Sequence, residues 1–308
     1  MKNFINISDH SSSDLRAIID EAKTRKLSRK GFNKSAPDED KPFEGKSMAM
    51  IFEKPSTRTR MSFDIAAKQL GGSSIILNPD GIHYGKGDET LKDTAKVLTE
   101  YVDIVMLRTS SHKNLEEFGK HLDIPIINGL SDKSHPCQIM SDILTYEESN
   151  GSITGKTVSW IGDGDNNMSN SLIEAAGKFK FNLKIGCPKK YAPGKKILGW
   201  AKKNKVNLLI TQKPDEAVKN SDCVMTDKWV SMNDKVNKKT KKKVLKPFQV
   251  NKKLMKKANS NAIFMHCLPV GRGEEVTDEV IDGKQSVVWR QALNRVHAQK
   301  SIIKWCLD

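Results

Sequence analysis

The chain has 308 residues, 37% of them hydrophobic, and this length is enough for two domains of ordinary size. Its longest apolar runs, such as NLLI and SIIL, are only of strand length and exclude a membrane-spanning helix. The 52 basic and 37 acidic residues give a formal net charge of +15, a charge that can attract nucleic acid nonspecifically.

The first half of the chain alternates strand-like and helix-like segments. Short β-rich apolar runs predict strands, and segments with apolar residues at helical spacing, such as Leu91, Ala95, Leu98 and Val102, predict helices. The expected strands are 47–52, 74–77, 103–108 and 124–128. The expected helices are 60–70, 90–102, a short one near 113–121, and one that opens at the motif HPCQ (135–138).

A Gly- and Ser-containing stretch, ESNGSITGK at 148–156, is typical of a linker, and the alternation restarts after it. The next expected strands are 157–163, 182–187, 207–210, 222–227, 262–269 and 286–289, with helices between them. The sequence therefore predicts an α/β protein with two doubly wound parallel-sheet domains. We expect a first domain at 1–147, a second at 148–290, and a terminal helix at 291–308 that packs back towards the first domain.

The motif EKPSTRTR (53–60) follows the first expected strand. Pro55 favours a helical first turn, and Ser56 or Thr57 can cap it. The N–H groups at the start of a helix, the hydroxyl groups and Arg58 would then face one point, which suits a phosphate. A capped helix with exposed arginines explains the local pattern equally well. The P-loop pattern is absent around GKS (45–47).

Two further strand ends in the first half carry polar residues. Arg108 ends the third expected strand, where a buried guanidinium is costly unless an anion pairs with it. His135 and Gln138 open the helix after the fourth strand. His135 taken alone is more simply read as a surface or core histidine. Because ligands gather at the carboxyl ends of parallel strands, the three junctions together favour a site for an anion and a carbonyl.

The second half places acidic and amide groups at its strand ends. The motif GDGDNN (162–167) lacks the glycine spacing of a dinucleotide loop, and its side chains suit an amine or amino acid better than a pyrophosphate. Asp227 and Ser231 follow another strand and can pair with an ammonium group. The two halves together indicate the transfer of a phosphorylated group to an amine.

The five cysteines are dispersed without a CxxC pair, which predicts reduced thiols and no metal site. Cys267 is simply read as a small buried residue. A nucleophilic role would need a base, and the adjacent His266 should point to the other face of its strand, which argues against covalent catalysis. The N-terminal stretch MKNFINISDHSSSD has no apolar signal core, so we expect a cytoplasmic protein.

The motifs, taken together and in order, resemble the aspartate/ornithine carbamoyltransferase family, and within it the ornithine-specific members. The resemblance covers essentially the whole chain. It rests on FEKPSTRTRMSFD, HPCQ, GDGDNN, DKWVSM, HCLPVGRGEEV and ALNRVH.

The resemblance implies two domains joined by interdomain helices, and a homotrimer whose sites are shared between subunits. It implies carbamoyl phosphate and L-ornithine as substrates, and L-citrulline and phosphate as products. The reaction would be a direct attack of the δ-amine through a tetrahedral intermediate, with no cofactor and no metal. The same site chemistry serves both citrulline synthesis and arginine breakdown.

The resemblance also implies roles for individual residues. The catalytic residues would be Arg108, His135, Cys267 and Arg295. Carbamoyl phosphate would contact these four together with Ser56, Thr57, Arg58, Thr59, His83, Gln138 and Leu268. Ornithine would contact Asn167, Asp227, Ser231 and Met232.

The chain departs from the family pattern at two positions. Asn233 follows the Ser-Met pair where glycine is usual, and His83 stands where other members have glutamine. Putrescine or N-acetylornithine stays open as an acceptor, whereas the acidic Asp227 disfavours aspartate. A nucleic-acid-binding protein is the alternative from another class. The lysine excess is spread along the chain without interleaved aromatic residues, so solvated lysine faces and no nucleic-acid partner are favoured.

Overall fold

A computed structural model describes residues 2–78, 89–230 and 237–308. The chain divides into two compact units, which we call unit 1 (Met1–Ser141 and Leu293–Asp308) and unit 2 (Asp142–Ala292). Both division points fall inside helices, α5 (Pro136–Asn150) and α12 (Val288–Leu307), so each of these helices has residues in both units. The boundaries predicted after residues 147 and 290 lie within the same two helices.

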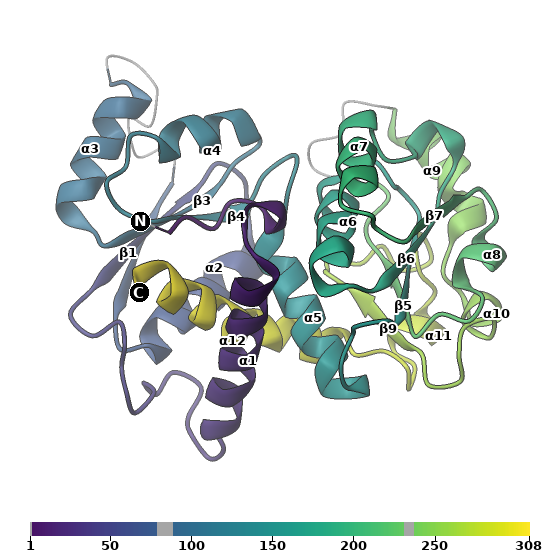
Figure 1. The fold of residues 1–308 in the computed structure, drawn as a ribbon, viewed down its shortest axis with the longest axis horizontal. Coiled ribbons are helices and arrows are strands. Elements are labelled where there is room, and N and C mark those ends of the chain that lie inside the picture. Colours follow the sequence, from purple (N-terminus) through teal and green to yellow (C-terminus); the bar gives the residue numbers. More distant parts are fainter. Residues whose placement is uncertain (1, 79–88, 231–236) are drawn as a thin grey trace. The chain divides into compact units, whose positions relative to one another are not determined.

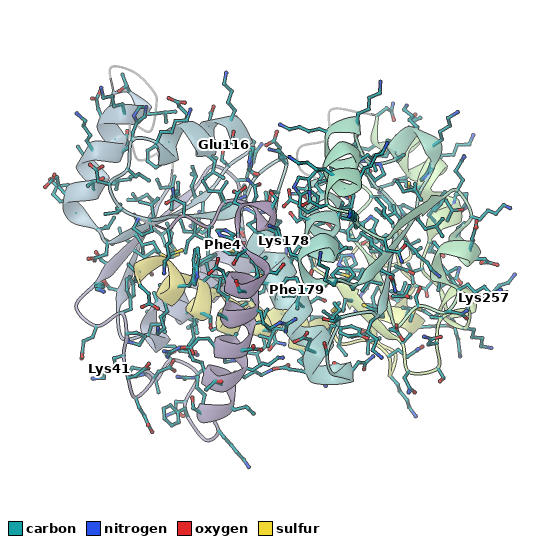
Figure 2. All side chains as sticks on the ribbon, in the orientation of Figure 1. Phe4, Lys41, Glu116, Lys178, Phe179 and Lys257 are labelled. Atoms are coloured by element: carbon teal, nitrogen blue, oxygen red, sulfur yellow. The ribbon has the colours of Figure 1, made fainter. Side chains whose placement is uncertain are left out.

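Unit 1 is built on a parallel sheet with the strand order β2–β1–β3–β4. The strands are β1 (Ser47–Phe52), β2 (Ser73–Leu77), β3 (Ile104–Arg108) and β4 (Ile126–Leu130). The helices are α1 (Ser12–Ser28), α2 (Thr57–Gln69), α3 (Leu91–Tyr101), α4 (His112–Gly119), the start of α5 and most of α12, with a 3₁₀ turn at Ile7–Asp9. Phe4, which is labelled in Figure 2, extends this sheet beside β4, because its N–H donates to Ile126 O at 2.9 Å.

Helices cover both faces of the unit 1 sheet. Figure 1 shows α3 and α4 on one face and α1, α2 and the C-terminal part of α12 on the other. Alternate residues explain the two layers, because successive side chains of a strand point to opposite faces. Ala49 and Ile51 of β1 and Val105 and Leu107 of β3 join the core under α3 and α4. Met48 and Met50, also buried, alternate with Ala49 and Ile51 along β1.

Unit 2 is built on a parallel sheet with the strand order β7–β6–β5–β8–β9. The strands are β5 (Thr157–Ile161), β6 (Asn182–Gly186), β7 (Leu208–Thr211), β8 (Cys223–Thr226) and β9 (Ile263–His266). The helices are α6 (Asn167–Phe179), α7 (Lys195–Lys203), α8 (Pro214–Val218), α9 (Lys238–Leu245), α10 (Lys252–Met255) and α11 (Asp278–Ile281), with 3₁₀ turns at Lys189–Tyr191 and Lys246–Phe248. Both units are thus parallel α/β domains, as predicted.

Three local predictions need correction. The expected strand 286–289 is wrong, because Val288 already begins α12 and Ser286 forms only an isolated bridge to Phe264. Val288 and Trp289 belong to the first turn of α12, and a short apolar run cannot distinguish a strand from a helical turn. The expected linker at 148–156 begins later, because α5 continues to Asn150. Helix α2 begins at Thr57 instead of residue 60, because Ser56 caps it.

Within the described part of the chain, no helix combines the length and the apolarity that crossing a membrane requires.

Candidate active site

The polar strand ends of unit 1 meet where the sheet order reverses. β1 lies between β2 and β3, and Phe52 is in register with Arg108. The segment that follows β1 is EKPSTRTR, so this motif and Arg108 share the switch point at which open α/β sheets bind ligands. Glu53 joins the two strand ends, because its Oε2 accepts hydrogen bonds from Thr109 Oγ1 at 2.6 Å and from the Ser110 N–H at 3.1 Å. Sequence reasoning missed this role of Glu53.

Helix α2 starts with a side-chain cap. The Oγ of Ser56 accepts the N–H of Thr59 at 3.2 Å, so Ser56 is the N-cap and Thr57, Arg58 and Thr59 form the first turn. The first N–H groups of a helix have no intrahelical acceptor, and the helix dipole adds partial positive charge there. The capped helix and the anion-binding turn, weighed as alternatives above, are therefore compatible features of the same turn.

Two arginines from distant parts of the chain converge on Thr59. Arg108 Nη1 donates to Thr59 Oγ1 at 3.3 Å, and Arg295 Nη2 donates to the same oxygen at 2.9 Å. Arg295 Nη1 also donates to Gln138 Oε1. None of these four residues is more than 7% exposed. Two guanidinium groups buried beside one neutral hydroxyl concentrate positive charge at the start of α2.

His135 lies immediately before α5 and is buried in the same region of unit 1. Burial is the main cause that lowers its pKa well below the ordinary value of 6.5, and the positive charges of Arg295, Arg108 and Arg58 lower that pKa further. The imidazole is therefore neutral near pH 7, and it can donate an N–H to a carbonyl oxygen without carrying charge. We call the first turn of α2 together with the buried groups around it the anion socket; its members are Ser56, Thr57, Arg58, Thr59, Arg108, His135, Gln138 and Arg295.

Cys137 lies between His135 and Gln138 in the sequence, but its thiol is unreactive. Burial raises the pKa of its thiol to about 12, and its Sγ donates to Asn128 O at 3.4 Å. A thiol with that pKa stays protonated at neutral pH and is a poor nucleophile.

Unit 2 has its own switch point between β5 and β8. The loop after β5 carries Asp163 and leads into α6, where Asn166 is the N-cap and Asn167 the first helical residue. Asp163 is buried, and its Oδ2 lies 2.6 Å from Nζ of Lys241 on α9, also buried. The other oxygen of Asp163 accepts the N–H of Asp165 at 2.9 Å. Asp163 was predicted to recognise an amine, but its carboxylate already pairs with this lysine.

The structure places Asp227 and Cys267 together. Asp227 follows β8, Cys267 follows the adjacent strand β9, and Cys267 Sγ donates to Asp227 Oδ1 at 3.0 Å. Both side chains are partly exposed. A carboxylate that is only partly buried and accepts a thiol hydrogen bond can also accept hydrogen bonds from an ammonium or amine group.

His266 holds the turn that follows β9. Its Nδ1 accepts the N–H of Leu268 at 2.8 Å, and its Nε2 lies 3.2 Å from Glu275 Oε1. Leu268 has a φ of 60°, a left-handed conformation that this hydrogen bond helps to hold. His266 therefore holds the backbone next to Cys267 with one ring nitrogen and faces Glu275 with the other. Glu275 lies within the motif HCLPVGRGEEV, but sequence reasoning gave it no role.

The atoms of Asp227, His266 and Cys267 that could bind a metal lie within 4.8 Å of one another. Because His266 accepts a backbone N–H at one nitrogen and faces Glu275 with the other, its imidazole has no lone pair left for a metal ion. We assign no metal to this cluster.

The structure thus brings the socket residues together within unit 1, and Asp227 with Cys267 within unit 2. Asn167 is the first residue of α6, in the connection that follows β5, and Leu268 lies two residues after β9. Three residues implied by the resemblance, His83, Ser231 and Met232, lie outside the described residues, as does Asn233.

Comparisons with known proteins match both parts of the chain. Residues 2–148 match the model of the aspartate/ornithine carbamoyltransferase carbamoyl-P binding domain. Residues 154–306 match the model of the aspartate/ornithine carbamoyltransferase Asp/Orn binding domain.

Individual relatives cover the chain from end to end. The protein named ornithine carbamoyltransferase from Brucella ovis is 49% identical over 308 residues, which are 100% of this chain and 96% of that protein. The protein of the same name from Rhizobium meliloti is 49% identical over 306 residues, 99% of this chain and 98% of that protein.

Solved structures agree with the sequence relatives. The ornithine carbamoyltransferase from Pyrococcus furiosus has a TM-score of 0.91 and 42% identity, covering 98% of this chain and 96% of that one. The anabolic ornithine carbamoyltransferase from Campylobacter jejuni has a TM-score of 0.91 and 35% identity, covering 99% of each chain.

Proposed function

Since the chain belongs to the aspartate/ornithine carbamoyltransferase family, we propose that it transfers the carbamoyl group of carbamoyl phosphate to the δ-amine of L-ornithine, giving L-citrulline and phosphate. The observation that carries this proposal is the anion socket, where Arg108 and Arg295 converge on Thr59 at the start of a helix.

Carbamoyl phosphate belongs in the socket of unit 1. Its phosphate matches the N–H groups of the first turn of α2 and the guanidinium groups beside them, since anions bind at helix N-termini and arginine pairs well with phosphate. Arg58 adds a further positive charge. The carbonyl oxygen requires donors that strengthen as it becomes an oxyanion. Thr59, Arg108 and the neutral His135 are proposed for this role, each worth on the order of 3 kcal/mol in the transition state.

Ornithine belongs in unit 2. The δ-amine must be neutral when it attacks, although a free alkyl amine has a pKa of roughly 10.4. We propose that Asp227 and Cys267 orient the amine, together with the backbone at Leu268, and that Asn167 binds the amino-acid end with Ser231 and Met232. The departing phosphate accepts the amine proton. The proposal calls for no cofactor, because carbamoyl phosphate already carries an activated leaving group.

A direct assay tests the reaction and the acceptor together. Purified protein with carbamoyl phosphate should form citrulline from ornithine, and little product from putrescine, N-acetylornithine or aspartate. Product from putrescine without product from ornithine would refute the acceptor assignment. Absence of any carbamoylated product, with binding to DNA or RNA that weakens steeply with salt, would favour the nucleic-acid alternative.

Arg58→Ala should remove most activity while the protein stays folded, because it deletes one positive charge of the socket. Arg60→Ala is the matched control, since Arg60 lies two residues further along α2. Its guanidinium carbon lies 4.5 Å from the centre of the Phe52 ring, and its Nη2 donates to Asn78 Oδ1 at 2.5 Å. Equal losses of activity in the two variants would contradict the assignment of Arg58.

We further propose a cytoplasmic homotrimer acting in arginine metabolism, in which His83 reaches the site of a neighbouring subunit. Large apolar side chains of unit 1 that stand exposed support the assembly. They are Met61 on α2, Ile75 and Ile76 on the edge strand β2, and Val97 and Tyr101 on α3, which are between 42% and 75% exposed. Light scattering should give three times the chain mass of 34.5 kDa, and Ile75→Lys should lower it.

A further inference from the structure

Side chains of helix α12 form hydrogen bonds with both ends of helix α2. Arg295 contacts Thr59 in the first turn, as described above. At the other end, Nζ of Lys300 lies 3.2 Å from Oε1 of Gln69, the last residue of α2. All four residues belong to unit 1, and the contacts follow the same order along both helices. The two contacted positions of α2 are ten residues, or roughly 15 Å, apart along its axis.

Lys300 is the buried member of the second contact. Its side chain is 0% exposed, and Nζ lies 2.6 Å from one oxygen of Asp38 and 2.8 Å from the other. Burying an ammonium group costs free energy unless the group is paired. The folded state is therefore stable only when α12 lies where Lys300 contacts Asp38 and Gln69.

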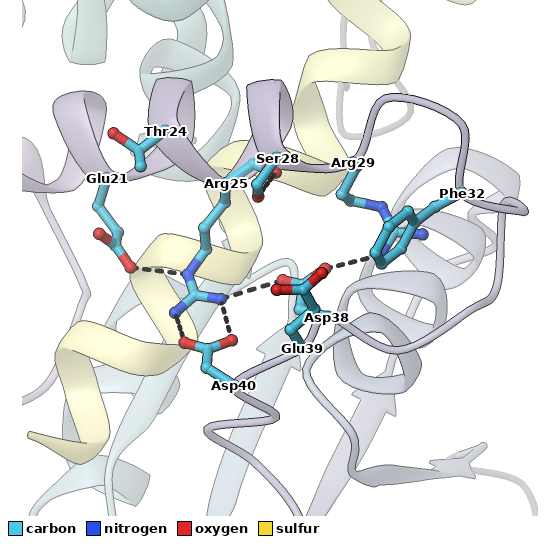
Figure 3. A pocket seen from close by; sticks show the side chains of 9 residues that line it. All are labelled: Glu21, Thr24, Arg25, Ser28, Arg29, Phe32, Asp38, Glu39 and Asp40. Atoms are coloured by element: carbon cyan, nitrogen blue, oxygen red, sulfur yellow. Dashed lines mark hydrogen bonds and ion pairs between the residues drawn. The ribbon is translucent and has the colours of Figure 1, made fainter.

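Asp38 is itself held in place by α1. Figure 3 shows Asp38 between Arg25 and Arg29, whose guanidinium nitrogens lie 3.0 Å and 2.6 Å from its two oxygens. Arg25 also binds Asp40 and Glu21, and these residues line a cavity of about 270 Å³ beside α1. The N–H of Asp38 donates to Gln69 O at 2.6 Å, so Asp38 is tied to the end of α2 as well.

The two contacts of α12 restrict different motions of the helix. Arg295 and Lys300 are five residues apart, which separates them by roughly 7.5 Å along the axis and 140° around it. Each contact fixes one point on the helix, and the two points lie on different sides of its axis. With both in place, neither a rotation nor a slide is possible without breaking a buried charged contact.

We propose that Lys300 is a positioning residue for the anion socket: its bonds to Asp38 and Gln69 set the register of α12 in which Arg295 reaches Thr59 and Gln138. This inference rests on the proposed function, since carbamoyl phosphate is the ligand assigned to that socket. Substrate-binding groups must be held closely for a reaction to be fast, and misplacement by about 1 Å can cost about a hundredfold in rate. Lys300 acts through Arg295 and touches no substrate.

Lys300→Met tests this role in the full-length protein. The variant removes the ammonium group and keeps an unbranched apolar chain, while Arg25 and Arg29 still compensate the charge of Asp38. We expect kcat/KM for carbamoyl phosphate to fall about tenfold to a hundredfold. Calorimetric affinity for inorganic phosphate should fall with it, and the KM for ornithine should change little. Lys300→Arg, which keeps the charge, should recover part of the phosphate affinity.

The matched control is Lys304→Met. Lys304 lies one turn further along α12, is partly exposed and pairs with Asp308 at 2.7 Å, away from the socket. Its substitution should leave phosphate affinity and kcat/KM unchanged.

A Lys300→Met protein with a lowered melting temperature but unchanged phosphate affinity and kcat/KM would overturn the inference, because a purely structural lysine predicts that result. If this variant does not fold, Gln69→Met removes one of the two acceptors of Lys300 and should weaken phosphate binding in the same direction; unchanged binding would overturn the inference. Phosphate affinity separates the two proposals. Unaltered protein that binds phosphate but forms no citrulline refutes the proposed function alone, whereas unaltered protein that binds no phosphate refutes both.

Discussion

The hydroxyl of Thr59 is the best point at which to perturb the anion socket. It accepts hydrogen bonds from two buried arginines, at 2.9 Å from Arg295 and 3.3 Å from Arg108. Thr59→Val deletes this acceptor and keeps the volume of the side chain. Valine and threonine are both β-branched, so neither a cavity nor a large change in helix propensity adds to the effect. The substitution therefore reports on the two hydrogen bonds.

The magnitude follows from the geometry of the two bonds. A hydrogen bond to a charged group contributes about 1.5–3 kcal/mol. The bond from Arg295 has ordinary length and should contribute fully, whereas the bond from Arg108 is long and should contribute less. We therefore expect Thr59→Val to lower the free energy of unfolding by about 2–4 kcal/mol. Thr59→Ser keeps the hydroxyl and loses one buried methyl group, for about 0.8 kcal/mol.

Urea unfolding of the full-length protein, followed by fluorescence and by circular dichroism, measures both variants. The expected order of stability is unaltered protein, Thr59→Ser, then Thr59→Val, with little change in the slope against urea. If Thr59→Val proves as stable as Thr59→Ser, then the two arginines do not depend on this hydroxyl, and Thr59 is not the group that holds the socket together.

Three further predictions concern other polar groups. Ser56→Ala should cost about 1 kcal/mol of stability in urea unfolding, because it removes the cap on the Thr59 N–H, whereas Ser56→Gly should cost only a few tenths. Lys241→Met should cost about 3–5 kcal/mol, because Asp163 is left as a buried charge, and adding Asp163→Asn should recover much of this loss in a double-mutant cycle. Burial and nearby positive charges lower the pKa of His297 to about 3 from 6.5, so the folded protein keeps this imidazole neutral while the unfolded chain binds a proton. Stability should therefore fall as the pH is lowered from 6.5 towards 3, and His297→Gln should flatten that slope in unfolding measured across this range.

Local sequence patterns predicted the strands and the start of the socket well. β1, β3 and β8 lie where their apolar runs predicted them, because a parallel strand buried on both faces produces a continuous apolar run. The cap at Ser56 was foreseeable for a similar reason, since a hydroxyl residue after a strand and before a helical pattern supplies the missing acceptor. The failure at 286–289 shows the limit of this reasoning, because three apolar residues in a row suit a strand or a helical turn equally.

The partners of the site residues could not be predicted from local patterns. Arg295 was assigned from a resemblance alone, and its contact with Thr59 joins residues 236 positions apart. Asp163 was expected to meet an amine and is instead paired with Lys241, one of five lysines between positions 238 and 243. Only Lys241 is buried in this run, because one side of α9 faces the interior of unit 2. The sequence shows the lysines but not which one is turned inward.

The sequence by itself determined the class of the fold, the strand ends that carry chemistry, and the family, because each depends on residues that are close together in the chain. The tertiary structure decided which of those ends become neighbours and how their charges are compensated. It placed Arg108 and Arg295 on the hydroxyl of Thr59, in the first turn of α2. It placed Lys300 against Asp38 and Gln69 at the other end of α2. These pairings depend on strand order and helix packing, which bring distant residues within hydrogen-bonding distance only when the whole unit has folded.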